Sequence, residues 1–380
     1  MRILLVGDYA RDARLGSTKV LVKLQQEFRA LGHVCDLVLA DDLGVHPRNA
    51  HLRRAIAPIS ALAAIRRAFR ANGAYDVVDV ASAEALWIAA ARRAGGFRHT
   101  AVVARSNGLE HLDYQRMLDD HDHGLLHKPW SRRLLYPVVR LSQVAAAARA
   151  ADRLILLNET DREFALGRRW KRGDQIDVVP HGVSSAFLAD APPRGAPRGR
   201  GILFCGSWAA VKGVTYLARA FSTMVASGVR TNLTVLGGGV DDETIRSAFA
   251  PDARPFVTIA GRVPEAEVMS TYRTHDVLAW PSTYEGFGMV VIEAMSQRLP
   301  VVATPVGCAR TLIDNEHTGL VVPARDPEAL AAALTRALDD ASLRIRLANA
   351  AFDVVRGMTW TRTARTTLAV YEKARANGDG

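Results

Sequence analysis

Short apolar runs alternate with amphipathic stretches along the first half of the chain. Residues 1–8 are apolar up to a Gly-Asp pair, and residues 34–42 and 75–80 form similar runs, so we predict buried strands there. Between the first two runs, residues 19–33 repeat apolar side chains at helical spacing and close at Gly32. This β-loop-α-β order predicts a parallel sheet with crossover helices. The order continues through elements that we predict at residues 85–94, 100–106, 134–151, 153–158 and 174–182.

The same alternation starts again after a segment with little periodicity. Residues 184–200 are rich in Pro, Gly, Ala and Arg, which is typical of a linker. Strands and helices then follow at residues 201–206, 215–225, 231–239, 256–261, 275–282, 298–307 and 318–323. We therefore predict an α/β protein with two doubly wound, parallel-sheet domains, at residues 1–183 and 201–360. The last helix, in residues 361–380, is expected to pack back on the N-terminal domain.

Composition and charge narrow the class of protein. The 380 residues are 49% hydrophobic and 23% charged, which is typical of a globular protein long enough for two domains. The formal net charge of +10 favours anionic partners, but no nucleic-acid recognition motif or aromatic platform is present, so we expect no nucleic-acid partner. The three cysteines lie far apart, which argues against a disulfide framework or a zinc site. The first ten residues contain a short apolar run that Asp8 interrupts, which predicts a strand and not a signal peptide. We therefore expect a cytoplasmic protein.

The stretch EGFGMVVIEAM, residues 285–295, carries the main candidate chemistry. It follows a predicted strand and opens a predicted helix, and ligands of open α/β sheets bind beyond the carboxyl ends of the strands. The free N–H groups of a first helical turn suit a diphosphate, and Gly288 lets the backbone approach it. Glu285 would lie in the loop, while Glu293, a turn into the helix, could accept two hydroxyl hydrogen bonds. The pattern suits a nucleotide sugar.

These residues resemble the E-x7-E signature of the retaining glycosyltransferases of family 4, the glycosyl transferases group 1. The run PSTYEGFGMVVIEAMSQRLPVVATPVG follows that family closely, and GSWAAVKG, residues 206–213, matches the spacing of its phosphate-binding segment. The resemblance is strong in the C-terminal half and mainly one of layout in the N-terminal half. It implies the GT-B architecture, in which two Rossmann-like domains face each other across a cleft.

The resemblance also implies a role for each matching residue. Glu285 and Lys212 would be the catalytic pair, with Glu285 at the donor sugar and Lys212 at the phosphates. Glu293 would bind the ribose hydroxyls, and Val263 would touch the base through its backbone. The backbone of Gly288, Met289 and Val290 would meet the phosphates, and Gly16 would let the N-terminal loop approach the diphosphate. Ser207 and Asn107 are donor-binding candidates that stand where the family has other residues.

Several positions depart from the family pattern, among them Gly16–Ser17 in place of a double glycine and Thr311 in place of a glutamate. Ser207 stands where the family usually has an arginine, which removes one bidentate phosphate ligand. Asn107 aligns with the usual histidine after the fourth N-terminal strand, and His111 lies four residues further on. These departures leave open whether donor binding and transfer are reduced or abolished.

Two further stretches allow alternative interpretations. Asp120, Asp122 and neighbouring histidines could form a metal cluster or a surface loop, and we expect no metal. Residues 48–71 place a stripe of apolar side chains beside six arginines. The stripe is typical of an amphipathic helix on its own sheet, although a membrane-surface or lipid-acceptor contact remains an alternative, with peripheral binding at the inner membrane face.

The sequence therefore predicts a retaining, metal-independent glycosyltransferase. It would move a sugar from a UDP- or GDP-linked donor to a glycan, lipid-linked or small-molecule acceptor held mainly by the N-terminal domain, and it would need no cofactor. Two alternatives stay open at this point. One is a nucleotide-sugar epimerase on the same architecture, and the other is a non-catalytic protein that binds sugar nucleotides.

Overall fold

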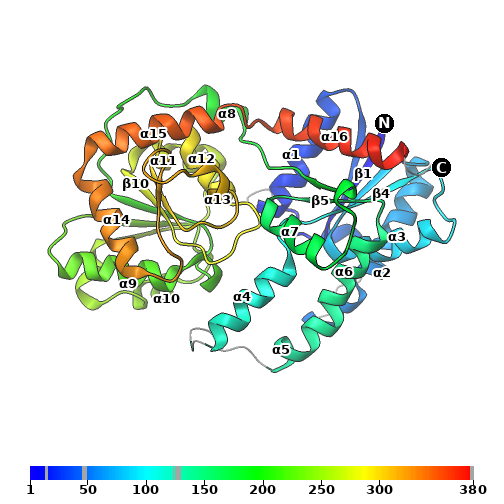
Figure 1. The fold of residues 1–380 in the computed structure, drawn as a ribbon, viewed down its shortest axis with the longest axis horizontal. Helices are drawn as coiled ribbons and strands as arrows, with labels where there is room; N and C mark the ends of the chain where they lie inside the picture. The colour runs from blue at the N-terminus through cyan, green and yellow to red at the C-terminus, as the bar shows by residue number, and fades with distance from the viewer. Residues whose placement is uncertain (13–15, 45–48, 123, 125–129, 377–380) are drawn as a thin grey trace. The chain divides into compact units, whose positions relative to one another are not determined.

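The chain divides into two compact units in a computed structural model that describes residues 1–12, 16–44, 49–122, 124 and 130–376. The first unit contains residues 1–181 and the C-terminal segment from Trp360 onward, and the second contains Gly182–Thr359. Each unit is a parallel sheet covered by helices (Figure 1). Among the described residues, no helix combines the length and the apolar character that a membrane crossing requires.

The first unit is built on a parallel sheet of six described strands. Their order is β2 (Val34–Val38), β1 (Arg2–Val6), β3 (Val77–Ala81), β4 (Ala101–Arg105), β5 (Arg153–Leu156) and β6 (Ile176–Val178). In register, Ile3 pairs with Cys35 on one side and Val77 on the other. Strands β3 to β5 are buried along their whole length, which explains their nearly continuous apolar sequence.

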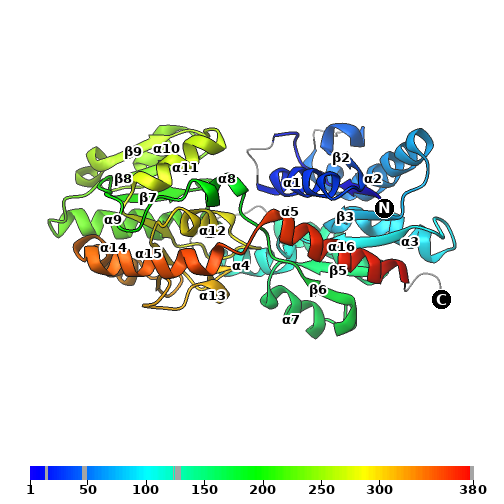
Figure 2. The same cartoon turned by 90° about the horizontal axis from the view of Figure 1, so that it is seen from above.

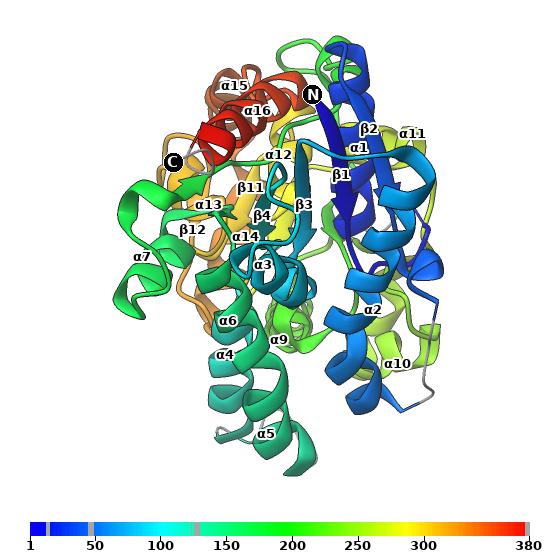
Figure 3. The same ribbon diagram turned by 90° about the vertical axis from the view of Figure 1, so that its right-hand side faces the viewer.

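Helices cover both faces of this sheet. Figure 1 shows α1 and α16 on one face and α2, α3 and α6 on the other, and Figure 2 shows α16 beside α1. The helical elements of the unit are α1 (Gly16–Ala30), η1 (Ala40–Leu43), α2 (Ala50–Asn72), η2 (Ser82–Ala85), α3 (Leu86–Arg93), α4 (Glu110–Asp122), α5 (Trp130–Tyr136), η3 (Pro137–Leu141), α6 (Ser142–Ala150), α7 (Glu159–Gly167), η4 (Gly173–Gln175) and α16 (Trp360–Ala376). α5, η3 and α6 follow one another without a break in the chain, and Figure 3 shows α4 and α5 extending past the strands.

A buried polar cluster attaches α16 to the first unit. The guanidinium of Arg105 on β4 binds both carboxylate oxygens of Asp79 on β3, at 2.6–3.1 Å. The hydroxyl of Tyr371 on α16 donates to Asp79 Oδ2 at 2.5 Å. These side chains are at most 1% exposed. Because a buried charge without partners is costly, this cluster fixes where the C-terminal helix packs.

The second unit repeats the architecture with a different strand order. Its parallel sheet runs β12 (Leu320–Val321), β11 (Val301–Ala303), β10 (Val277–Trp280), β7 (Ile202–Cys205), β8 (Leu233–Leu236) and β9 (Val257–Ala260). Its helical elements are α8 (Ser185–Ala189), η5 (Ala210–Lys212), α9 (Val214–Ala226), α10 (Asp242–Ser247), η6 (Pro251–Phe256), α11 (Glu265–Thr274), α12 (Met289–Ser296), α13 (Ala309–Leu312), α14 (Pro327–Asp339) and α15 (Ala341–Val355). Strand β10 lies next to β7, so the loops that follow these two strands are neighbours.

Residues 184–200, predicted as a linker, belong to the second unit in the structure. They begin with α8 and are bonded to that unit at several points. Arg273 and Arg298 donate hydrogen bonds to the backbone oxygens of Asp190 and Pro192. Arg198 donates to the carbonyls of Tyr272 and His275, at 2.6 and 3.0 Å. Arginine–carbonyl bonds hold the segment to the second unit, together with Phe187 of α8, which is 1% exposed.

Candidate donor site

The loops after β7 and β10 bring the two predicted catalytic residues together. Lys212 Nζ donates a hydrogen bond to Glu285 Oε1, and Ser282 Oγ donates to the same oxygen at 3.2 Å. The Lys212 and Glu285 side chains are 27% and 11% exposed, so the ion pair is partly shielded from water. The pair joins residues 73 positions apart in the chain. It places one cation and one carboxylate at the carboxyl edge of the sheet.

Close backbone contact between the two loops makes this pairing possible. The backbone N–H of Thr283 donates to Val211 O at 2.8 Å. Gly213 has φ +69°, and a Cβ atom there would lie 1.9 Å from the carbonyl oxygen of Pro281. Only glycine fits this position, because the backbone is left-handed and because the carbonyl of Pro281 leaves no room for a Cβ atom. The KG spacing seen in the sequence therefore has a structural cause.

Helix α12 begins at the same edge. Its N-cap is Gly288, with φ 96°, and no side chain caps this end. A Cβ atom at Gly288 would lie 2.6 Å from the Trp280 ring, so the glycine allows the turn to pack on β10. The first-turn N–H groups, which include those of Met289 and Val290, have no partner within a helix and carry the positive end of its dipole. Such a helix start is suited to bind an anion.

Glu293 lies on the buried side of α12 and is 7% exposed. The hydroxyl of Tyr272, on α11, donates to Glu293 Oε2 at 3.2 Å and lies 3.6 Å from Cys205 Sγ at the end of β7. Burial raises the pKa of Tyr272, and the neighbouring Cys205 and Glu293 raise it further, so this hydroxyl stays a donor. The tyrosine therefore helps to hold the Glu293 carboxylate at the carboxyl edge.

The remaining predicted residues of this unit lie on adjoining loops. Ser207 is exposed directly after β7, and the next residue, Trp208, donates its backbone N–H to Gly238 O at 2.7 Å. Val263 is half-buried between β9 and α11. The guanidinium of Arg262 lies close to Gly239, since a Cβ atom there would be 3.1 Å from Arg262 Nη2. We did not predict Arg262, because a single loop arginine carries no motif.

Gly16 and Asn107 belong to the first unit. Gly16 is exposed at the start of α1. Asn107 follows β4, and its Nδ2 donates to the hydroxyl of Tyr9 at 3.1 Å. Its Oδ1 is a buried acceptor with no hydrogen-bond partner among the described residues. His111 packs on Trp170, with ring centroids 4.7 Å apart, and burial lowers the pKa of His111 to about 4.

The acidic stretch at the end of α4 is only partly described. Two histidines of the predicted cluster, His123 and His127, lie outside the described residues. Asp120 is 3% exposed and its carboxylate binds the guanidinium of Arg116 one turn earlier. An arginine-paired carboxylate is a poor cation ligand. In the part of the chain that the structure describes, no group of three or more His, Cys, Asp or Glu side chains is placed to hold a metal ion.

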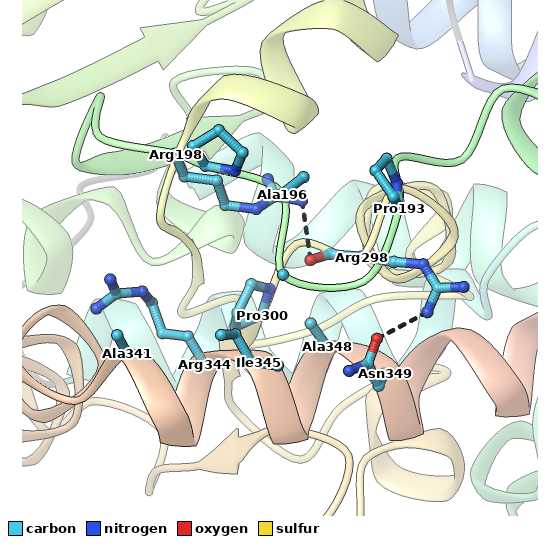
Figure 4. A pocket seen from close by; sticks show the side chains of 12 residues that line it. Pro193, Ala196, Arg198, Arg298, Pro300, Ala341, Arg344, Ile345, Ala348 and Asn349 are labelled. Atoms are coloured by element: carbon cyan, nitrogen blue, oxygen red, sulfur yellow. Dashed lines mark hydrogen bonds between the residues drawn. The ribbon is translucent and has the colours of Figure 1, made fainter.

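A cavity of about 260 Å³ lies at the opposite edge of the second unit, beside the segments that precede β7 and β11 (Figure 4). Arg198 and Arg298 line it, but both guanidinium groups donate to backbone carbonyls. Arg298 also donates to Asn349 Oδ1 at 2.9 Å and lies over the ring of Phe352. We assign this cavity no ligand, because its cations are already used to hold the chain.

Comparison with known proteins identifies relatives of this chain. The family described as glycosyl transferases group 1 matches residues 199–340. A D-inositol 3-phosphate glycosyltransferase from Xylanimonas cellulosilytica is 31% identical over 329 residues, which cover 81% of this chain and 74% of that protein. The chain belongs to the glycosyl transferases group 1. The family expected from the sequence is thus confirmed.

Other relatives are matched over less of their length. A D-inositol 3-phosphate glycosyltransferase from Kineococcus radiotolerans is 33% identical over 63% of this chain. The chain spans 54% to 61% of the length of this relative and two other curated ones. Among solved structures, sucrose-phosphate synthase from Thermosynechococcus elongatus has a TM-score of 0.77 at 21% identity, covering 99% of this chain and 100% of that one. This likeness, with two parallel six-stranded sheets, confirms the predicted GT-B fold.

Proposed function

We propose that this member of the family is a retaining, metal-independent glycosyltransferase whose second unit binds a nucleoside diphosphate sugar. The observation that carries the proposal is the Lys212–Glu285 pair beside the start of α12. Lys212 and the first-turn N–H groups of α12 would bind the diphosphate of the donor. Glu285 would contact the sugar attached to it. Glycosyltransferase relatives support this activity, and they do not favour the epimerase alternative.

Each group has a part in donor binding. Lys212 and the N–H groups of the α12 start would hold the diphosphate, which supplies the positive charge that a metal provides elsewhere. Glu293, oriented by Tyr272, would accept the ribose hydroxyls, and the backbone at Val263 would meet the base. Arg262 adds a guanidinium on the same edge, which offsets the arginine absent at Ser207.

The proposed reaction is a front-face displacement. As the bond from the anomeric carbon to the diphosphate breaks, the acceptor hydroxyl attacks from the same face. The leaving diphosphate takes the acceptor proton, while Lys212 stabilises the negative charge. The configuration at the anomeric carbon is then kept. Asn107 in place of the family histidine fits this route, because an amide cannot act as a general base.

A ligand screen tests the proposal. We expect one nucleoside diphosphate, UDP or GDP, and its sugar conjugate to raise the melting temperature, because a ligand of the native state adds RT ln(1 + [L]/Kd) to stability. The stabilising sugar nucleotide is then incubated with candidate acceptors, and transfer is followed by mass spectrometry. If no sugar nucleotide stabilises the protein, the proposed donor site is wrong. Binding without transfer to any acceptor would instead favour the non-catalytic alternative.

A further inference from the structure

The first unit contains an arginine-rich pocket that the donor site does not use. Its volume is about 240 Å³. It lies beyond the carboxyl ends of β1, β3 and β4, which is where ligands of parallel sheets bind. We call it the arginine pocket, and it is lined by Asp8, Tyr9, Arg53, Arg54, Ser82, Glu84, Glu110, Arg132, Tyr136 and Arg140.

Arg140 binds both glutamates of this pocket, and Asp8 is its third acidic residue. Its guanidinium donates to Glu84 Oε1 at 2.7 Å and to both oxygens of Glu110 at 2.9 Å. Ser82 and Tyr136 donate their hydroxyls to Glu110 as well, at 2.8 and 2.9 Å. These glutamates are therefore fully engaged with neighbours, and they are poorly placed to hold a further cation.

Three other arginines bring the lining to four arginines against three carboxylates, a net charge of +1. Arg53, Arg54 and Arg132 all line the pocket, and within the described residues none of them forms an ion pair with a carboxylate. The guanidinium carbons of Arg132 and Arg54 lie 3.7 and 5.8 Å from the centroid of the Tyr136 ring. Burial lowers the pKa of Arg54, and the nearby Arg132 charge lowers it further. Cations crowded in this way favour a bound anion.

An apolar groove adjoins the arginine pocket and shares part of its wall. The groove has a volume of about 330 Å³ and is lined by Asn49, Leu52, Arg54, Ala55, Leu135, Tyr136, Val139 and Arg140. Arg54, Tyr136 and Arg140 line both spaces. Leu52 and Leu135 are 52% and 44% exposed. Ile59 on α2, Leu134 on α5 and Val138 on η3 are also exposed. Half of the ten large apolar side chains exposed in the described chain thus lie on α2, α5 and η3.

We propose that the arginine pocket and the apolar groove together bind one anionic lipid, the acceptor of the sugar. Its phosphate lies among Arg53, Arg54 and Arg132, and the first part of its hydrocarbon chain lies on Leu52 and Leu135. Charge complementarity selects the anion, and the adjoining groove selects a ligand with an apolar tail. That the bound lipid is the acceptor rests on the proposed function; that the site binds such a lipid does not.

The test uses ligands that stay monomeric in water. Binding of dihexanoyl phosphatidylglycerol to the full chain is measured by calorimetry and compared with dihexanoyl phosphatidylcholine and with glycerol 3-phosphate. We expect the phosphatidylglycerol to bind at least about tenfold more tightly than either. Arg54→Gln and Arg132→Gln should each weaken it by about tenfold, since each removes a charge-assisted hydrogen bond. Arg66→Gln, an exposed arginine of α2 that lines neither space, should change nothing.

The groove has its own pair of variants. Leu135→Gln should weaken phosphatidylglycerol about fivefold and leave glycerol 3-phosphate binding unchanged, because only the tail loses apolar contact. Val354→Gln on α15, which is 41% exposed, is the matched control and should affect neither ligand. Melting temperatures of all variants establish that each is folded.

Several outcomes would overturn the proposal. Equal affinity for phosphatidylglycerol and glycerol 3-phosphate would mean that the pocket takes a free phosphate. Equal affinity for the two lipids would remove the role of the arginines, and an equal loss in Arg66→Gln would indicate a general surface charge. Binding to phosphatidylglycerol vesicles but not to the monomeric lipid would indicate a membrane-docking face instead. Nucleotide binding is measured on the same samples, so failure of the donor site and failure of the lipid site are seen separately.

Discussion

Replacing Glu293 with glutamine tests the donor site at its most buried carboxylate. The change keeps the shape of the side chain and removes its charge. Glu293 is 7% exposed and receives a hydrogen bond from Tyr272 at 3.2 Å. The glutamine oxygen can still accept that bond, so we expect the melting temperature to change little. The effect should appear in nucleotide affinity, because only the carboxylate accepts two ribose hydroxyls at full strength.

The expected loss can be estimated from the hydrogen bonds involved. A hydrogen bond to a charged group contributes about 1.5–3 kcal/mol, so losing that strength should raise Kd by roughly 10- to 150-fold. The assay is calorimetric titration with the nucleotide that stabilises the wild type most. Tyr272→Phe gives a second, graded perturbation, because it leaves the carboxylate in place and removes one group that orients it. Its loss should be smaller, about 1 kcal/mol.

The controls separate binding from folding. Ser296→Ala removes a buried hydroxyl one turn further along α12, where it donates to Glu293 O, and so perturbs the helix without touching the carboxylate. It should lower stability and leave Kd unchanged among folded molecules. If Glu293→Gln binds every nucleotide as tightly as the wild type does, the ribose assignment is refuted.

Four further predictions test other parts of the argument. Lys212→Met should lower the rate of transfer by about 10²–10³-fold, as measured by initial rates, because a charge-stabilising donor is lost; an unchanged rate would remove Lys212 from the reaction. Transfer should persist in excess chelator, and complete loss that manganese or magnesium restores would contradict this. NMR coupling constants should show that the product keeps the anomeric configuration of the donor, whereas clean inversion would exclude the proposed mechanism. Asp79→Asn should destabilise the chain by about 3–5 kcal/mol in denaturant unfolding, because Arg105 would stay buried without its counter-charge; a change below 1 kcal/mol would contradict that reasoning.

The local pattern of the sequence was sufficient to predict the strands and the start of α12. Strands buried on both faces need continuous apolar runs. The left-handed turn that opens α12 favours glycine, and Gly288 stands there with φ 96°. The pair Glu285 and Glu293 was also visible, since its spacing is a property of one short segment. The resemblance to the family rests on these same local features.

The tertiary structure decided which distant segments meet. Lys212 reaches Glu285 only because β7 lies beside β10, and strand order is not written in any local pattern. The stripe in residues 48–71, for which two interpretations were open, divides in the structure: Ile65 is buried in the core while Leu52 and Ile59 are exposed. A periodic pattern gives the face of a helix but not how far the sheet covers it.

The arginine pocket is the clearest case of a site that local sequence patterns do not predict. Its residues come from segments that follow β1, β3 and β4 and from the helical elements α2, α5 and η3, none of which carries a recognisable motif. Single arginines in an arginine-rich chain look alike in sequence. Arg140 is bound by two glutamates, whereas Arg54 and Arg132 face a shared space beside an apolar groove. Only the tertiary structure decides which of these arginines is paired with carboxylates and which is available to a ligand. The reason is that the neighbours of each arginine come from distant segments, which meet only when the sheet is assembled.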